Sequence, residues 1–161
     1  MSQFILDKFN ERFISVKKLE KTLNVKFKDK EYAIQALTTP SFVNEYPEQL
    51  DRVYHNDALA TLGDAVLKTT ISENIFRRER GIDEGTLTTR KSMIENNENL
   101  RRIAIELNIE NLLIKTEKEI IGEDTLPTAM EAIIGAIYLS NGIKSVKKFV
   151  QDMIIDKTDI N

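Results

Sequence analysis

Cysteine is absent from this chain of 161 residues. Its absence excludes both a disulfide framework and a thiolate zinc site. The single histidine, His55, excludes histidine-rich metal centres and would have to act alone in any Ser-His hydrolase. No nucleophile accompanies His55, so we expect it to make a hydrogen bond at the start of a helix. Only six glycines and three prolines interrupt the chain, which favours long helices.

Long apolar runs are also missing. The N-terminal segment MSQFILDKFNERF has no apolar stretch of signal-peptide length, and no later run is long enough to span a bilayer. Hydrophobic residues make up 41% and charged residues 30%, which suits one domain with a real core and a solvated surface. The net charge of −3 gives no broad basic surface, so any nucleic-acid site must be local. We expect a soluble, cytoplasmic protein with no membrane partner.

Apolar residues recur at helical spacing along most of the chain, and no segment alternates as a strand does. We predict helices in the N-terminal segment, in 28–39, in 56–80, as a pair within 83–109 meeting near Asn96 and Asn97, in 127–141 and in 143–155. We predict a loop with a short turn for 41–55 and a loop for 122–127. The two most apolar helices, 56–80 and 127–141, should lie at the centre.

The predicted fold is therefore all-α, a helical bundle around two central apolar helices. We divide it into an N-terminal helical extension (1–18), a main domain (19–155) and a tail (156–161).

Small residues mark both central helices: Gly63 in one, and Ala132, Gly135 and Ala136 in the other. Such residues let two backbones approach closely, and a crossing there would bring Asp64 and Glu131 together. Two carboxylates out of water repel each other and need a cation, a shared proton or a basic neighbour. Acidic clusters at helix crossings are sites at which helical proteins hold hard ions such as Mg²⁺.

Four segments in order carry a resemblance to a known family. They are LEKTLNVKFKDKEYAIQALTTPSFVNE (19–45), HNDALATLGDAVL (55–67), DEGTLTTRKSMIENNENLRRIAIELNI (83–109) and MEAIIGAIYLSNGIKSVKKFV (130–150). Together they resemble the ribonuclease III family. The resemblance implies a ribonuclease III-type endonuclease domain, dimeric and all-helical, that cuts double-stranded RNA with Mg²⁺ or Mn²⁺. We expect no separate double-stranded-RNA-binding domain.

The family's four metal-binding carboxylates carry over only in part. The family's first pair is a Glu and an Asp four residues apart, and this chain has Ala60 and Asp64 at those positions. The second pair is an Asp and a Glu three residues apart, and this chain has Thr128 and Glu131 there. Asp64 and Glu131 are thus our candidate catalytic residues, and both, with Asp57 from the start of the signature, are candidate metal ligands. With two carboxylates replaced, we expect metal binding to be weak or absent.

Lys68 follows Asp64 by four residues, the favourable order for a helical ion pair. The family usually has a small residue there. One interpretation is that the Lys68 ammonium partly neutralises Asp64; the other is a solvated lysine at the edge of the helix.

The resemblance also suggests residues for assembly and RNA binding. The family commonly has a bulky residue that enters a socket on the partner subunit, and here that position is Thr61. Thr61 and its neighbour Leu62 are our dimer candidates, and the small Thr61 leaves both a homodimer and a heterodimer with an intact homologue open. Arg77, Arg78, Lys91 and Glu84 are candidate RNA contacts, although each also suits an ordinary solvated helix.

Three functions follow from this sequence. We expect a ribonuclease III-like protein of RNA processing that binds double-stranded RNA and cuts it weakly or not at all. The alternatives are an active Mg²⁺-dependent endoribonuclease and a non-catalytic structural or dimerisation subunit of a ribonucleoprotein.

Overall fold

A computed structural model describes residues 3–46 and 53–158 of the chain. Within these residues the backbone is helical, and the single β-type pairing there is an isolated bridge between Thr38 and Ile114. The elements are α1 (Gln3–Leu23), α2 (Lys30–Leu37), α3 (Pro40–Glu45), α4 (Asp57–Arg78), α5 (Glu84–Glu95), α6 (Asn97–Glu106), the 3₁₀ turn η1 (Ile109–Leu112), α7 (Thr125–Asn141), α8 (Ile143–Val150) and the π-helical turn η2 (Gln151–Ile155). The predicted all-α fold is confirmed.

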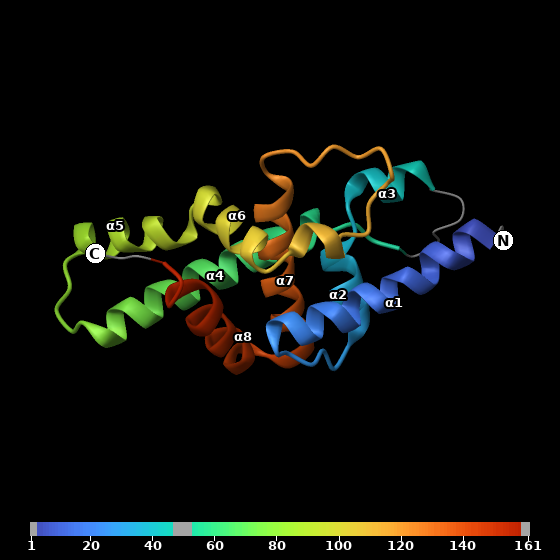
Figure 1. Cartoon of the computed structure of the whole chain (residues 1–161). Helices are drawn as coiled ribbons and strands as arrows, with labels where there is room; N and C mark the ends of the chain where they lie inside the picture. Colours follow the sequence, from blue (N-terminus) through green and yellow to red (C-terminus); the bar gives the residue numbers. More distant parts are fainter. Residues whose placement is uncertain (1–2, 47–52, 159–161) are drawn as a thin grey trace.

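The two apolar helices predicted to be central are α4 and α7, and they make the most extensive contact of any two elements. In Figure 1, α7 runs through the middle of the molecule, with α1 and α2 on one side and α5 and α8 on the other. Nearly every residue of α7 from Leu126 to Ile137 is buried, as its apolar sequence predicted. No helix in the described ranges is both long and apolar enough to cross a membrane.

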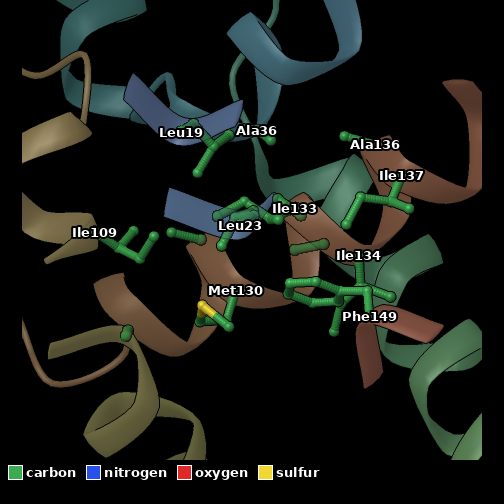
Figure 2. Packing of buried hydrophobic residues seen from close by; sticks show 14 of the residues in the cluster. Leu19, Leu23, Ala36, Ile109, Met130, Ile133, Ile134, Ala136, Ile137 and Phe149 are labelled. Carbon is green, nitrogen blue, oxygen red and sulfur yellow. The ribbon is translucent and has the colours of Figure 1, made fainter. Parts of the chain in front are cut away.

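The core forms around α7. Figure 2 shows Met130, Ile133, Ile134 and Ile137 of this helix among side chains from other parts of the chain. The largest side chains that are fully buried come from α1, α2, α4, α5, α6, η1 and α7: Leu19, Leu37, Leu67, Ile71, Ile94, Leu100, Ile103, Ile109, Met130, Ile133, Ile134 and Ile137. Burying one such side chain contributes roughly 1.5–3 kcal/mol. The core therefore holds the outer helices against α7.

Glycine sets the distance between α4 and α7. A Cβ atom added to Gly63 would lie 1.7 Å from the carbonyl oxygen of Glu131, and one added to Gly135 would lie 2.6 Å from the carbonyl oxygen of Leu59. Both helices are therefore in backbone contact at this point. The predicted crossing is present, and it places Asp64 and Glu131 directly beside it.

Two local predictions were wrong. The loop expected for 122–127 is shorter than predicted, because α7 already begins at Thr125. We expected a loop and a short turn for 41–55, but its first part belongs to α3. The Thr39 hydroxyl accepts a hydrogen bond from the Phe42 N–H at 3.4 Å, and Pro40 takes the first helical position, where no N–H donor is needed. The proline that ends α2 thus also begins α3. Residues 47–52 lie outside the described part of the chain.

The predicted meeting point of two helices at Asn96 is confirmed. Asn96 is both the C-cap of α5 and the N-cap of α6. Its side-chain oxygen accepts from the Asn99 N–H at 2.9 Å, and its amide donates to the carbonyl groups of Ser92 and Met93 at 2.9 and 3.0 Å. One side chain thus satisfies the ends of both helices.

The division of the chain at residue 18 remains a prediction. Helix α1 is continuous from Gln3 to Leu23, so it crosses that boundary without a break. Val16 on one side of the boundary and Leu19 and Leu23 on the other are all buried.

Substituting Gly63 by alanine should destabilise the whole fold. The new methyl group would overlap the Glu131 carbonyl, so α4 and α7 would have to move apart, and we expect a loss of about 3 kcal/mol or more in the free energy of unfolding. Urea unfolding measures this loss. The control is Gly122→Ala, whose Cβ would meet nothing closer than 3.6 Å. Equal stability of the two variants would contradict the close crossing.

Candidate functional site

A cleft of about 610 Å³ opens beside the crossing, between α4, α5 and α7. Polar and acidic side chains dominate its lining: Asp57, Ala60, Thr61, Asp64, Lys68, Ser92, Glu95, Asn96, Asn97, Thr128 and Glu131. The cleft brings together all the positions that the sequence suggested for a metal site, from two helices more than sixty residues apart in the chain.

Asp64 and Glu131 face the same space. Burial raises the pKa of Glu131 to about 7, and repulsion from the Asp64 carboxylate adds to this rise, whereas the charge of Lys68 lowers it. The two carboxylates are therefore close enough to oppose each other's ionisation. Their predicted proximity is present, and their proposed roles as metal ligands stay predictions.

Lys68 forms the ion pair that its spacing predicted. Its Nζ donates a hydrogen bond to Asp64 Oδ2 at 2.7 Å, and its side chain is 45% exposed. This hydrogen bond raises the pKa of Lys68 more than desolvation lowers it. The charges of Glu95 and Glu131 raise the pKa of Lys68 further, so the ammonium lies in the field of several carboxylates.

Glu95 is a site residue that the sequence analysis missed. It is the last residue of α5, and its side chain is only 15% exposed. Its Oε2 atom is buried and has no hydrogen-bond partner, while Oε1 lies 3.8 Å from Lys91 Nζ. In the sequence, Glu95 stands four residues after Lys91, the spacing of an ordinary helical ion pair. The useful signal was its place immediately before the Asn96 junction, where the chain turns beside α7.

Asp57 lies at the outer end of the cleft. It is the first residue of α4, its side chain is 59% exposed, and Oδ2 lies 3.7 Å from His55 Nδ1. His55 Nδ1 also accepts a hydrogen bond from the Asp57 backbone N–H at 3.4 Å. This confirms the prediction that His55 bonds the start of a helix.

Comparison with known proteins places this geometry in a family. A family model described as Ribonuclease-III-like matches residues 29–158, most of the chain. The chain belongs to the ribonuclease III-like family. Ribonuclease 3 from Chlorobaculum tepidum is 36% identical over 131 residues, which are 78% of this chain and 48% of that protein. Ribonuclease 3 from Rickettsia conorii is 35% identical over 144 residues, 86% of this chain and 63% of that protein.

Solved structures agree with this ribonuclease III-like assignment. The nuclease domain of ribonuclease III from Campylobacter jejuni superposes with a TM-score of 0.76 at 32% identity, covering 88% of this chain and 96% of that one. Dicer from Giardia intestinalis has the same fold at 21% identity, with a TM-score of 0.73 over 94% of this chain and 20% of its own. The chain thus spans about half to two thirds of the curated relatives above and nearly all of a ribonuclease III nuclease domain.

The residues of this ribonuclease III-like cleft do not fit a Mg²⁺ ion held by four carboxylates. Ala60 ends at a buried methyl group, and Thr128 offers only a neutral hydroxyl, a weak ligand for Mg²⁺. Asp64 already binds an ammonium. Within the described ranges, no group of three acidic or histidine side chains is arranged to hold a metal ion.

The candidate RNA-binding residues belong to two helices, α4 and α5. Arg77 Nε is 2.8 Å from Glu73 Oε1, and the Arg78 guanidinium donates to Gln151 at 2.9 Å, both at the far end of α4. Lys91 lies one turn before Glu95 in α5, and Glu84 is the exposed first residue of that helix.

The two dimer candidates differ in their surroundings. Thr61 is exposed at the cleft, and its hydroxyl donates to the Asp57 carbonyl at 3.2 Å, whereas Leu62 is partly buried against the core. Their role in assembly stays a prediction.

Protonation of Glu131 should make stability depend on pH. Because its pKa rises from 4.5 to about 7 on folding, the native state holds its proton more tightly, and the free energy of unfolding should fall as the pH rises through this window. The slope is at most about 1.4 kcal/mol per pH unit. Urea unfolding between pH 5 and pH 8 should show a flatter profile for Glu131→Gln. The other titratable groups are the same in the wild-type protein and in Glu131→Gln, so their contributions cancel when the two profiles are subtracted.

The matched control for this measurement is Glu110→Gln, an exposed acid in η1. It should leave the pH profile of the wild-type protein unchanged. A profile for Glu131→Gln that runs parallel to the wild-type profile would show that Glu131 does not carry this dependence.

Proposed function

We propose that this ribonuclease III-like domain binds double-stranded RNA in cytoplasmic RNA processing and cuts it weakly or not at all. The observation that carries the proposal is the composition of the cleft. Two of the four positions expected to hold carboxylates are Ala60 and Thr128, and Asp64 is paired with Lys68.

Charge arithmetic gives the scale of the loss. Metal-assisted phosphodiester hydrolysis needs an activated water and a stabilised leaving oxygen, which depends on a correctly held ion. At an effective dielectric near 20, removal of one anionic ligand costs Mg²⁺ binding a few kcal/mol. Two such losses greatly weaken any ion and misplace its water. Residual Mg²⁺-dependent cleavage, supported by Asp57, Asp64 and Glu131 with water, is the second candidate function.

RNA binding depends on where the cations lie. Four acidic side chains line the cleft against the single cation Lys68, so the cleft itself does not attract phosphate. Exposed arginines gather instead at and just after the far end of α4: Arg77, Arg78 and Arg80. Lys147 of α8 lies close to them, because its Nζ is 2.7 Å from Oε2 of Glu73 in α4. We propose this end of α4 as the surface that meets the RNA backbone.

A partner subunit forms part of the proposal. The Campylobacter jejuni nuclease domain is described as having a region involved in dimer formation. Because Thr61 buries less apolar area than a bulky side chain would, we propose a weak homodimer or a heterodimer with an intact homologue. The third candidate function, a structural subunit without RNA binding, uses the same interface.

Restoring the two missing carboxylates should restore cleavage. We expect the wild-type protein to leave double-stranded RNA nearly intact with Mg²⁺ or Mn²⁺, and Ala60→Glu with Thr128→Asp to gain metal-dependent cleavage. The matched control, Ala60→Gln with Thr128→Asn, adds similar volume without charge and should stay inactive. A labelled duplex resolved on a denaturing gel measures all three. Wild-type turnover of about one per second or faster would refute the proposal and support the active enzyme.

Charge removal at the end of α4 should weaken RNA binding in a salt-dependent way. For Arg77→Gln with Arg78→Gln, we expect the slope of log affinity against log salt to fall by about 2, one for each lost phosphate contact. The control, Lys17→Gln with Lys18→Gln, removes the same charge from an exposed face of α1. A filter-binding titration at several salt concentrations compares them. Absence of binding by the wild-type protein at low salt would favour the structural subunit.

A further inference from the structure

Besides the exposed Asp57, three carboxylates from three helices line the cleft: Asp64 from α4, Glu131 from α7 and Glu95 from α5. The burial of these groups is uneven but substantial. Asp64 is 34% exposed and Glu95 only 15%, and Glu131 is partly buried. Carboxylates removed from water in this way are stabilised by a cation close by or by taking up a proton.

Lys68 is the one cationic side chain among the described residues that line the cleft. It reaches Asp64 Oδ2 at 2.7 Å from one turn further along the same helix. An ammonium is a compact charge with three donors, so it can serve several carboxylate oxygens in turn. Glu95 Oε2, which is buried without a hydrogen-bond partner, is an oxygen still open to such a donor.

We infer that the Lys68 ammonium is the resident cation of this cleft and keeps divalent metal ions out of it. A divalent ion and an ammonium repel each other and compete for the same Asp64 oxygens, so one excludes the other. The chain itself thus supplies, through Lys68, the positive charge that a metal ion would otherwise bring. Glu95 completes the acidic shell in the absence of carboxylates at positions 60 and 128.

This inference deepens the proposed function and rests on its claim that the cleft does not work as a Mg²⁺ site, but it can be tested without RNA. RNA binding measured in EDTA tests the proposed function alone. Metal binding in the absence of RNA tests the role of Lys68 alone. If Lys68 proves not to exclude metal, the replacement of two carboxylates still accounts for weak cleavage.

The experiment is a titration of the full chain with Mn²⁺, followed by the loss of the free-ion electron paramagnetic resonance signal. We expect Lys68→Met to bind Mn²⁺ at least tenfold more tightly than the wild-type protein. The matched control is Lys148→Met, which removes a lysine from the same kind of four-residue pair, with Asp152, on α8. It should bind no better than wild type. Adding Glu95→Gln to Lys68→Met should reverse most of the gain.

Thermal unfolding gives a second measurement that does not depend on the strength of binding. In EDTA, Lys68→Met should unfold at a lower temperature than the wild-type protein, and Mn²⁺ should raise its midpoint while leaving that of the wild type unchanged. Lys68→Gln, which keeps a hydrogen-bond donor beside Asp64, serves if Lys68→Met does not fold. Tight Mn²⁺ binding by the wild-type protein, or no gain in either Lys68 variant, would overturn the inference.

Discussion

The contact between Gly63 and Gly135 governs the rest of this structure. Because neither residue has a side chain, α4 and α7 meet backbone to backbone, and the Glu131 carbonyl occupies the space that a Cβ atom of Gly63 would need. The outer helices pack around this pair, and the buried residues of α7 form the centre of the core. The same contact sets the width of the cleft beside it. Fold and site therefore depend on one short interhelical distance.

The electrostatics of the cleft follow from that distance. Close packing takes Glu131 partly out of water and sets it near Asp64, and these two effects raise the pKa of Glu131. Any protein with this crossing must balance the resulting negative charge. Here a lysine one turn from Asp64 provides a positive charge. The family architecture is thus present, with an ion pair between Lys68 and Asp64 at its acidic centre.

Much of this arrangement was accessible from the sequence, for identifiable reasons. Small residues at Gly63 and Gly135 predicted the crossing, because only small residues allow it, and the four-residue spacing of Asp64 and Lys68 predicted their ion pair. Helix α3 was missed because the proline that ends one helix also suits the start of the next. Glu95 was missed because its neighbours in space, on α4 and α7, are far from it in sequence. Local spacing connected it only to Lys91.

Asn96 shows how little freedom the chain has near the site. A single residue separates α5 from α6, and its side chain is bonded to both helices. Each residue of an α-helix turns the next by about 100°. Gain or loss of one residue here would therefore swing the end of α5 around its own axis. A substitution at Glu95 can change the charge on this side of the cleft and leave α5 in place. A change in chain length at Asn96 would also reorient the helix.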